Sequence, residues 1–410
     1  MLSIMRSVVE HQAVVAALFP APEAVRLPTP DALGLVTMGD VHAPISLPGF
    51  DNSAMDGYAV RAAEIASATP EHPVALPVAH DIPAGRTDSL VLAPGTAHRI
   101  MTGAPLPEGA DAVVPVELTD GSTSTVSITA AVEVGKHIRA AGSDILHGER
   151  ALPSGTVIGA SQVGLLSALG IAEVTVARRL RVVVLSTGSE LVAPGTELEH
   201  GQIYESNGAM LTAAVTEAGA IARHLHFVPD DVDDFLARLD TVADDADAII
   251  TSGGVSAGAF EVVKDALSRN PDVEFVKVAM QPGMPQGCGH IAAPGGRRVP
   301  IVTLPGNPVS ALVSFEVFIR PPLRAAAEMS PHRPRVHARL GSAVRSTPGK
   351  RQFLRGVIRS DDGAAPIVDP IGPPASHHLR YLAAADALID IPPEVTELAP
   401  DDDVEVLRLG

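Results

Sequence analysis

One stretch of the chain, residues 179–321, alternates short apolar runs with glycine-rich turns and helix-like segments. The runs that predict strands are RVVVLSTGSEL, ARHLHFVP, DAIITSGGVSAG and RVPIVTLPGNP. The helix-like segments between or after them are SNGAMLTAAVTEAG, DDVDDFLARLDTVAD, FEVVKDALS and PVSALVSFEVFI. Strands that alternate with helices form parallel βαβ units, so this stretch predicts an open, doubly wound and mostly parallel sheet.

The helices of this stretch carry recognisable start and stop signals. The first has Ser206 or Asn207 as its N-terminal cap and Gly219 as its stop, and Pro308 suits the first turn of the last. The second helix is predicted to be amphipathic, with one apolar face made of Val232, Phe235, Leu236, Leu239 and Val242.

Three of the predicted strands run into loops rich in glycine and hydroxyl groups, at residues 186–190, 252–258 and 304–308. Ligands of open α/β sheets bind at the carboxyl ends of the strands. Glycine lets backbone N–H groups approach an anion, and helix N-termini add partial positive charge. These loops predict a crevice for a phosphate or another oxyanion. No Gly-Lys-Ser/Thr or G-x-G-x-x-G motif accompanies them, which excludes a P-loop and a dinucleotide fingerprint.

Acidic residues also gather beside these loops, namely Glu190, Asp230, Asp231 and Glu261. Carboxylates around an anion imply a hard cation such as Mg²⁺, which one or two carboxylates and substrate phosphates hold together. Asp230 and Asp231 have an equally good second interpretation, because they precede a helix whose dipole favours negative charge. The fifteen histidines show no ligand-like spacing, and we assign none of them a role.

The flanking regions are different in character. An apolar helix is predicted over 6–19, and short apolar runs split by glycine and proline predict a β-rich region over 44–139. A helix that ends at Gly170 and a short strand follow. Short strands return after residue 324 (RVHARL, RQFLRGVIR, ALIDIP and DVEVLRL), which predicts a small β barrel or sandwich.

Composition excludes several classes of function. The net charge of −18 disfavours non-specific nucleic-acid binding. No apolar run of about 18 residues predicts a membrane span, and no secretory signal is expected. Cys288 is the single cysteine, which fits a cytoplasmic protein. Residues 329–360 contain no acidic residue but eight cations, so this stretch is either the basic face of a β domain or a wall that faces an anion.

Six motifs, taken together, resemble one known family. They are PGFDNSAMDGYAVR (48–61), RIMTGAPLPEGADAVVPVE (99–117), AGSDI (141–145), LSTGSEL (185–191), ITSGGVSAG (250–258) and LPGNPVSA (304–311). In this order they resemble the molybdopterin molybdenumtransferase family of the bacterial MoeA type, which is related to the E domain of gephyrin. The resemblance extends over residues 6–409.

The resemblance implies an enzyme of molybdenum cofactor synthesis. Such enzymes insert molybdate into adenylyl-molybdopterin and release AMP in a Mg²⁺-dependent step. It also implies a homodimer with sites at the subunit interface, and four domains: a discontinuous, elongated linker domain (1–45 and 139–178), a β-rich second domain (46–138), a MogA-like α/β molybdopterin-binding domain (179–325) and a C-terminal β-barrel domain (326–410).

Matching motifs carry the family's site residues onto this chain. The catalytic candidates are Asp56, Thr102, Asp144 and Glu190, and the candidate metal ligands are Glu190, Asp230 and Glu261. The substrate-binding candidates are Arg139, Lys277, Pro305, Pro308, Arg355 and Ser376, to which the glycine-loop argument adds Ser252, Gly253, Gly254 and Ser256. In the first motif, Asp51 and Asn52 are expected to fix a turn that Phe50 and Met55 anchor, with Tyr58 packing or donating, so that Asp56 is presented across a dimer crevice.

The sequence departs from the family at three positions. Glu261 stands where relatives usually have aspartate, and Gln281 and Met284 stand where many have lysine. These changes suggest a paralogue with an altered preference. The alternatives beside molybdate insertion are a pterin-binding scaffold or carrier without chemistry, which the gephyrin resemblance makes conceivable, and a related enzyme that inserts tungstate or adenylylates the apo-pterin.

Overall fold

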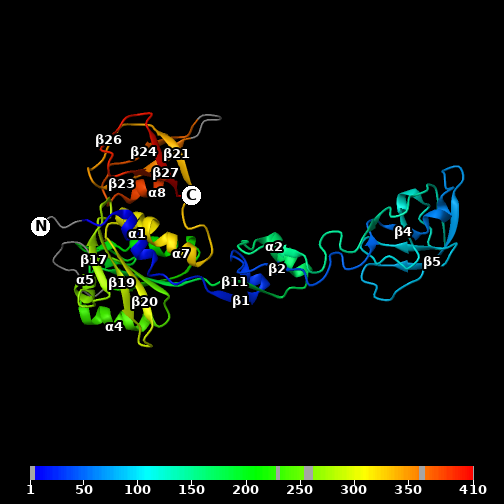
Figure 1. Cartoon of the computed structure of the whole chain (residues 1–410), viewed down its shortest axis with the longest axis horizontal. Helices are drawn as coiled ribbons and strands as arrows, with labels where there is room; N and C mark the ends of the chain where they lie inside the picture. The colour runs from blue at the N-terminus through cyan, green and yellow to red at the C-terminus, as the bar shows by residue number, and fades with distance from the viewer. Residues whose placement is uncertain (1–4, 228–230, 254–261, 360–364, 410) are drawn as a thin grey trace. The chain divides into compact units, whose positions relative to one another are not determined.

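The computed structural model describes residues 5–227, 231–253, 262–359 and 365–409. The chain divides into two compact units, Met1–Val25 with Ala177–Gly410 (unit 1) and Arg26–Val176 (unit 2), and each is described by itself. Unit 1 holds the α/β sheet and the C-terminal strands, drawn from green to red in Figure 1. None of the helices in these described ranges combines the length and the apolar character that a bilayer span requires.

Unit 1 is organised around a six-stranded sheet with the order β15-β12-β16-β20-β19-β17. Its strands are β15 (Ile221–Phe227), β12 (Arg181–Thr187), β16 (Ala248–Ser252), β20 (Arg298–Leu304), β19 (Pro285–Ala292) and β17 (Val273–Lys277). The first four are parallel, and β19 is antiparallel to both of its neighbours. The predicted mostly parallel, doubly wound sheet is therefore confirmed, although the sequence pattern did not reveal β17 and β19.

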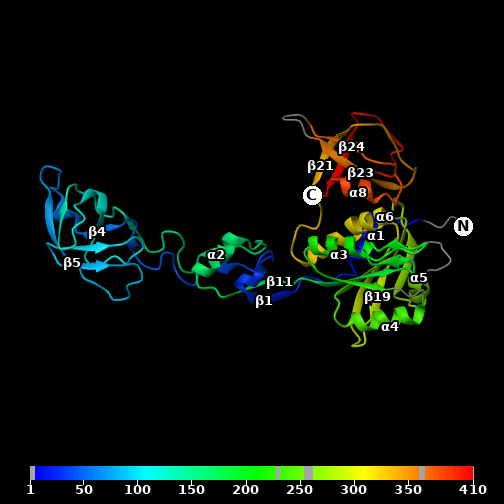
Figure 2. The same ribbon diagram turned by 180° about the vertical axis from the view of Figure 1, so that it is seen from behind.

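Helices cover both faces of this sheet, because successive side chains of a strand point to opposite sides. Val182 and Val184 of β12 belong to one core with α1 (Val8–Ala16), α3 (Asn207–Glu217), α6 (Pro308–Ser314) and α7 (Arg320–Ala326). Val183 and Leu185 belong to a second core with α4 (Val232–Ala243) and α5 (Val262–Leu267). Figure 2 shows α3 and α6 on one side of the strands and α4 on the other.

The helix ends follow the sequence signals with one exception. Pro308 occupies the first turn of α6, which continues through a π-helical stretch, η4 (Phe315–Ile319), into α7. Asp231 caps α4 by accepting hydrogen bonds from the amides of Asp233 and Asp234. Ser206 precedes α3 but its side chain makes no capping bond. Of the predicted apolar face of α4, Phe235, Leu239 and Val242 are buried, whereas Leu236 is 38% exposed.

The C-terminal strands of unit 1 close into a barrel, as predicted. The strands β23 (Arg351–Arg359), β24 (Ile367–Pro370), β21 (Arg335–Leu340), β27 (Asp403–Arg408) and β25 (Ala387–Ile391) pair in that order, and β25 pairs again with β23. The short elements β22 (Val344–Arg345), β26 (Glu397–Leu398) and α8 (Leu379–Ala384) accompany it. A further strand, β18 (Met280–Gln281), comes from the α/β part and pairs with β23, so the two parts are joined.

The basic stretch 329–360 lies mainly in ion pairs. Five of its arginines contact carboxylates of the same unit, namely Arg333, Arg335, Arg345, Arg351 and Arg359. Arg351, for example, binds both oxygens of the buried Asp390. These partners favour the interpretation as a basic face of the barrel over a wall that faces an anion.

Unit 2 contains a five-stranded sheet with the order β7-β4-β6-β5-β8, formed by β7 (Ala112–Pro115), β4 (Gly57–Val60), β6 (Ala97–Ile100), β5 (Val74–Ile82) and β8 (Thr125–Ile128). Three two-stranded sheets accompany it: β3 (Asn52–Ser53) with β9 (Ile138–Arg139), β2 (Val41–His42) with β10 (Arg150–Leu152), and β1 (Ala24–Pro28) with β11 (Glu173–Ala177). Its helical elements are α2 (Ala160–Ala168), η1 (Thr29–Ala32), η2 (Ala62–Ile65) and η3 (Val116–Leu118).

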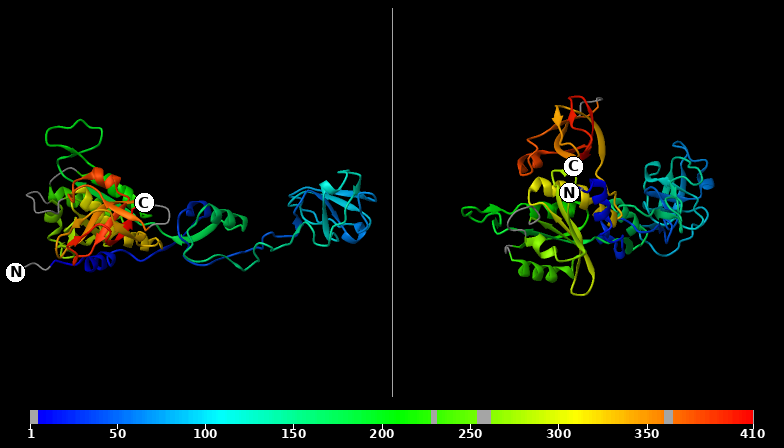
Figure 3. Two further views of the ribbon diagram at one scale, coloured as in Figure 1. Left: turned by 90° about the horizontal axis from the view of Figure 1, so that it is seen from above. Right: turned by 60° about the vertical axis from the view of Figure 1, so that its left-hand side comes forward.

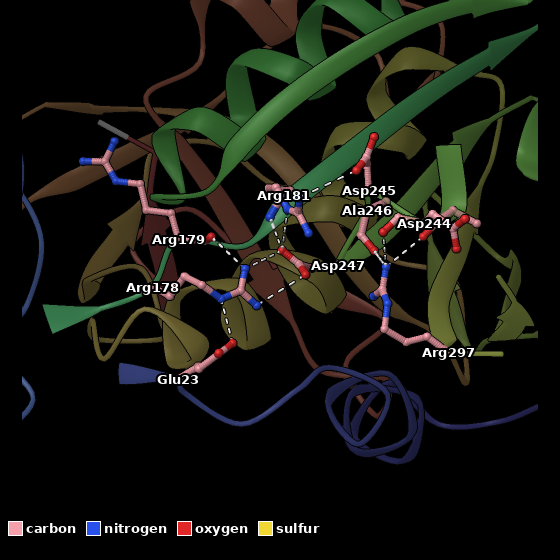
Figure 4. A network of polar contacts seen from close by, with 10 residues as sticks. Glu23, Arg178, Arg179, Arg181, Asp244, Asp245, Ala246, Asp247 and Arg297 are labelled. Atoms are coloured by element: carbon pink, nitrogen blue, oxygen red, sulfur yellow. Dashed lines mark hydrogen bonds and ion pairs between the residues drawn. The ribbon is translucent and has the colours of Figure 1, made fainter. Parts of the chain in front are cut away.

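A polar network ties together the amino ends of the parallel strands in unit 1 (Figure 4). The carboxylate of Asp247, just before β16, accepts hydrogen bonds from the Arg178 guanidinium and from the Arg181 amide, each at 2.7 Å. Arg178 also binds Glu23, and Arg297 donates to the carbonyls of residues 243, 244 and 246. This end of the sheet is thereby fixed by local polar contacts.

Candidate active site

A pocket of about 1060 Å³ opens at the carboxyl ends of β12, β16 and β20. Its lining comes from residues 186–191, 203–207, 252–253, 281–285, 305–308 and 374–377, with Val262, Ser310 and Leu379. All of these residues belong to unit 1. The predicted crevice at the strand ends is thus a real cavity, and the loop before the barrel's α8 adds a further wall.

The loop after β12 brings a carboxylate to this pocket. Gly188 has φ +149°, and a side chain at this position would meet the Glu190 carboxylate at 2.6 Å. Glycine is therefore required, because it allows both the backbone conformation and the close approach of Glu190. No described residue donates a hydrogen bond to the Glu190 carboxylate or pairs with it, so Glu190 is free to bind a ligand or a cation.

The segment from Glu190 to β14 projects from unit 1 as a long loop (Figure 3). The short strands β13 (Leu191–Val192) and β14 (Ile203–Tyr204) pair at its base, and the residues between them are exposed. This pairing brings Glu190 and Glu205, fifteen positions apart in the sequence, to one pocket lining.

The segment after β14 supplies a polar wall that the sequence did not reveal. Glu205 is buried, and its Oε1 accepts hydrogen bonds from the Ser186 hydroxyl (3.0 Å) and from the Gly208 amide at the start of α3. Asn207 donates to the Ser252 hydroxyl (2.9 Å) and to the Gly306 carbonyl (2.7 Å). Asn207, one of the two predicted caps of α3, therefore has another task, and Glu205 accepts the hydrogen bond from the helix amide.

Several predicted substrate-binding residues line the pocket. Ser252, Gly253, Pro305, Pro308 and Ser376 are all part of its surface. Gly253 has φ +101°, and a side chain there would approach the Thr187 carbonyl at 2.8 Å, so glycine is required at this turn as well. Gly254 and Ser256, together with the candidate metal ligands Asp230 and Glu261, lie outside the described residues.

Arg355 has a different environment from the one that an anion contact implies. The residue is 4% exposed, and its guanidinium donates to the carbonyls of Pro373, Ala375 and His378. Burial lowers the pKa of Arg355 below its ordinary value. Arg355 is absent from the pocket lining, whereas the loop it holds contains Ser376, whose carbonyl accepts from the Val309 amide. The structure therefore assigns Arg355 the positioning of this loop.

The charge of the pocket is unusual for an anion site. Within its described lining, Glu190 and Glu205 are the acidic residues and no lysine or arginine is present. Lys277 is exposed at the end of β17 and does not line the pocket, while Gln281 and Met284 do. Neutral donors such as hydroxyls, amides and backbone N–H groups must therefore carry anion binding, or a cation must mediate it.

The catalytic candidates Asp56 and Thr102 lie together in unit 2. One oxygen of Asp56 accepts hydrogen bonds from both the amide and the hydroxyl of Thr102, each at 2.7 Å. The amide bond first, and then the hydroxyl bond, lower the pKa of Asp56 below its ordinary value. Gly57 must be glycine, because any side chain would overlap the Val114 carbonyl. Asp56 is thus held as an ionised carboxylate at the edge of β4.

The surrounding motif is organised differently from the predicted turn. Phe50 is 53% exposed and Met55 is 36% exposed, so neither anchors it. Asp51 accepts from the distant Ala141 amide, whereas Asn52 donates to the Phe50 carbonyl nearby. The apolar anchor is Tyr58, which is fully buried and donates its hydroxyl to the Ser122 carbonyl.

The remaining candidates of unit 2 are exposed. Arg139 pairs with Asn52 across β9 and β3, and Asp144 follows in the adjacent loop, where its amide donates to the Leu47 carbonyl. Both side chains are therefore available for binding. Across the described residues of the whole chain, no group of three or more metal-ligating side chains is preassembled.

His224 is a second residue of the pocket region that sequence reasoning left without a role. Its Nε2 lies 3.2 Å from the Ser186 hydroxyl and 3.8 Å from Glu205 Oε2. The local signal that would have revealed Glu205 is an acidic residue three positions before Gly208, the glycine at the start of α3. The contact with His224 depends on the pairing of β12 with β15 and has no local signal.

Comparisons with known proteins cover the whole chain. Residues 6–170 match the model described as "MoeA N-terminal region (domain I and II)", residues 183–325 match "Probable molybdopterin binding domain", and residues 337–409 match "MoeA C-terminal region (domain IV)". A crystal structure of the molybdopterin biosynthesis MoeA protein from Pyrococcus horikoshii is similar, with a TM-score of 0.79 at 31% identity over 99% of this chain and 100% of that chain.

Curated relatives show the same similarity. Molybdopterin molybdenumtransferase 2 of Mycobacterium tuberculosis is 57% identical over 99% of this chain and 100% of its own length. The molybdopterin molybdenumtransferase of Bacillus subtilis is 34% identical over 88% of this chain and 84% of its own length. With these matches over nearly its full length, the chain belongs to the molybdopterin molybdenumtransferase (MoeA) family.

Proposed function

We propose that this chain inserts molybdate into adenylyl-molybdopterin and releases AMP, which completes the molybdenum cofactor. Membership of the family supports a transferase of molybdenum cofactor biosynthesis. The observation that carries the finer proposal is the large pocket at the strand ends, with an unengaged carboxylate, Glu190, opposite loops of glycine and hydroxyl groups. Such a pocket suits a phosphoanhydride, an oxyanion and a divalent cation together.

The residues of the pocket fit Mg²⁺ binding. Glu190 is exposed to the pocket, and no described side chain or amide engages its carboxylate. Mg²⁺ prefers one or two carboxylates together with substrate phosphates and water, so a preassembled cage is not required. Glu190 would hold the ion, which would offset phosphate charge when bound. Asp230 and Glu261 remain candidate ligands outside the described residues.

The other pocket residues bind and orient the substrates. The backbone around Gly253 and Gly306 offers neutral donors to phosphate or molybdate oxygens. Pro305 and Pro308 shape the turn into α6, and Arg355 holds the loop of Ser376 against the same helix. Breaking the phosphoanhydride consumes one water molecule, and a carboxylate beside the phosphates can orient that water.

We further propose a homodimer in which unit 2 of one subunit completes the pocket of the other. The two sets of catalytic candidates support this, because Asp56 and Thr102 lie in unit 2 whereas Glu190 lies in unit 1. We also propose a cytoplasmic location. Cys288, the single cysteine, is free and buried, and burial raises the pKa of its thiol to about 12. A buried thiol of this kind is unreactive, and a chain without disulfides suits the reducing cytoplasm.

The activity is tested with the purified full-length chain and adenylyl-molybdopterin. We expect AMP release, measured by chromatography, to require both added molybdate and Mg²⁺. AMP release that does not depend on added molybdate would refute molybdate insertion. Tight binding without any release would instead identify a scaffold or carrier, and stimulation by tungstate alone would identify the tungstate-inserting paralogue.

The dimer is tested by mixing two inactive variants, Asp56→Ala and Glu190→Ala. If each site takes Asp56 from one subunit and Glu190 from the other, mixed dimers have one intact site. An equal mixture with free subunit exchange should then regain about a quarter of the wild-type rate. No recovery in mixtures whose subunits are shown by mass spectrometry to exchange would place both residues of a site in one chain.

A further inference from the structure

Three side chains in the pocket wall, Glu205, Asn207 and Ser252, present polar atoms that no described residue engages. They lie together at the junction of β14 with α3 and at the end of β16. None of the catalytic roles proposed above uses Glu205 or Asn207. Their hydrogen-bonding capacity defines what kind of ligand edge fits against them.

The amide of Asn207 has a fixed orientation. One nitrogen, Nδ2, donates to the Gly306 carbonyl at 2.7 Å and to the Ser252 hydroxyl at 2.9 Å. A carbonyl can only accept, so the nitrogen and the oxygen of this amide cannot be exchanged. Oδ1 is consequently buried and without a hydrogen-bond partner. A buried unpaired acceptor costs free energy unless a ligand satisfies it.

Glu205 offers a second acceptor beside it. Its Oε1 takes hydrogen bonds from the Ser186 hydroxyl and the Gly208 amide, which fixes the carboxylate plane. Oε2 receives no hydrogen bond from any described residue, and the ring of His224 is its ion-pair neighbour at 3.8 Å. The residue is 4% exposed and lines the pocket.

Ser252 adds a donor next to the Asn207 amide. Its oxygen accepts the Asn207 Nδ2 bond at 2.9 Å, and no described acceptor takes its own hydroxyl proton. The three residues therefore have an unengaged acceptor on Glu205, an unengaged acceptor on Asn207 and an unengaged donor on Ser252. A complementary ligand edge offers two N–H donors and a carbonyl oxygen.

We propose that Glu205, Asn207 and Ser252 recognise the 2-amino-4-oxopyrimidine edge of the pterin ring. This edge carries an amino group, a ring N–H and a carbonyl oxygen in that order. An adenine edge offers one donor and one acceptor, and would leave the Glu205 carboxylate unsatisfied. The proposal rests on the proposed function in naming molybdopterin as the ligand, and it places the pterin against this wall.

The test compares two pteridines that differ at one position. Pterin has the 2-amino group, whereas lumazine has a carbonyl oxygen there. Binding to the full-length wild-type chain is measured near neutral pH from the intrinsic fluorescence of each pteridine. We expect pterin to bind at least about tenfold more tightly, because a carbonyl facing Oε2 replaces a charge-assisted hydrogen bond with a repulsive contact.

The substitution Glu205→Gln should reverse this preference. The Gly208 amide still needs an acceptor, so the glutamine oxygen replaces Oε1 and its NH₂ group replaces Oε2. A donor then faces position 2 of the ring, which favours lumazine and repels the amino group of pterin. The ratio of the two dissociation constants should change by about 100-fold, tenfold for each ligand.

Ser252→Ala is the matched control, because both pteridines have the 4-oxo group. Binding of both should weaken by the same factor, with their ratio unchanged. Equal binding of pterin and lumazine by the wild-type chain, no binding of either, or an unchanged ratio in a folded Glu205→Gln variant would each overturn the proposal. If the wild-type chain distinguishes pterin from lumazine but releases no AMP from adenylyl-molybdopterin, the proposed reaction is refuted and the pterin subsite is retained.

Discussion

The two ends of the central sheet in unit 1 differ in how their polar groups are satisfied. At the amino ends of β12, β16 and β20, the buried Asp247 has its hydrogen bonds supplied by Arg178 and Arg181 (Figure 4). At the carboxyl ends, Glu190 and the Asn207 oxygen have no partner among the described residues. Complete satisfaction stabilises a fold, whereas unsatisfied groups in a cavity await a ligand.

Both ends are built from the same strands, so the difference does not come from the core. It comes from the loops. The loops at the amino ends are held together by ion pairs between arginine and aspartate. The loops at the carboxyl ends contain glycine, whose small size leaves the pocket open. Substitutions at the amino ends should therefore change stability with little effect on chemistry, and substitutions at the carboxyl ends should do the reverse.

The largest expected effect is that of Glu190→Gln on the reaction. If Glu190 holds the cation, its loss should slow molybdate-dependent AMP release by about 100-fold, while the thermal unfolding midpoint stays unchanged. The measurement is the rate at saturating adenylyl-molybdopterin together with calorimetry. The matched control is Glu197→Gln, in the exposed loop after β13 and outside the pocket lining.

A wild-type rate in Glu190→Gln would remove this residue from the proposed metal site. A lowered unfolding midpoint would contradict the contrast between the two ends of the sheet, because it would show that an unpartnered carboxylate at the carboxyl end stabilises the fold.

The second effect is that of Asp247→Asn on stability. The amide keeps the shape but loses the charge that two arginines face, so the free energy of unfolding should fall by about 2 kcal/mol. Denaturant titration measures the change, and the rate of AMP release by the folded variant should match that of the wild type. A variant as stable as the wild type would mean that the network in Figure 4 contributes nothing net.

Acid unfolding gives an independent measure of the same carboxylate. Burial alone would raise the pKa of Asp247, but the hydrogen bonds from Arg178 and the Arg181 amide hold it below its ordinary value. The contribution of Asp247 is then present above the unfolded pKa of about 4 and is lost as the pH falls through the lower folded pKa. The stability difference between the wild type and Asp247→Asn should therefore shrink as the pH is lowered from about 4 through the folded pKa.

Much of the α/β fold was predictable because its signals are local. The β-branched run of β12 and the glycine turns after β12 and β16 identify a buried parallel strand and its loop. The antiparallel strand β19 escaped prediction because it contains Gly287 and Gly289, and glycine ordinarily interrupts a strand. A side chain at Gly289 would overlap the Asp272 carbonyl, so the glycine permits a close backbone approach that only the fold reveals.

The site was predictable where its residues are next to glycine loops. Ser252, Pro305 and Glu190 line the pocket for this reason. Glu205 was missed because its function arises from contacts with Ser186 on another strand. The four predicted domain boundaries and the roles of Asp230 and Glu261 stay predictions.

The third effect concerns Arg355, which the family resemblance assigns to an anion, whereas its contacts in the structure are with the carbonyls of a loop. Lysine keeps the charge but cannot donate to three carbonyls as the guanidinium does. Arg355→Lys should therefore raise the KM for molybdate by about tenfold, as much as Arg355→Met does, with a smaller change in kcat. The Val309 amide is bonded to the Ser376 carbonyl. Faster hydrogen exchange at this amide in the Arg355 variants than in the wild type would show that the loop of Ser376 has been released.

Arg345→Lys is the control for this pair, since Arg345 is 89% exposed and paired with Glu397 at the surface. A lysine variant with wild-type KM beside a defective methionine variant would show that positive charge matters here. Arg355 would then return to the role of an anion contact, and the pocket would have a cation that its lining does not show.

The smallest effect should come from Asp245→Asn, two positions from Asp247 in the same network. The Asp245 side chain is 78% exposed and only 4.0 Å from the Arg181 guanidinium, whereas that of Asp247 is 9% exposed. Water screens the exposed pair, so the free energy of unfolding should change by less than about 0.5 kcal/mol. Denaturant titration of both variants under identical conditions makes the comparison. If Asp245→Asn cost as much as Asp247→Asn, long-range charge would explain the stability of this end of the sheet, and burial with complete hydrogen bonding would not.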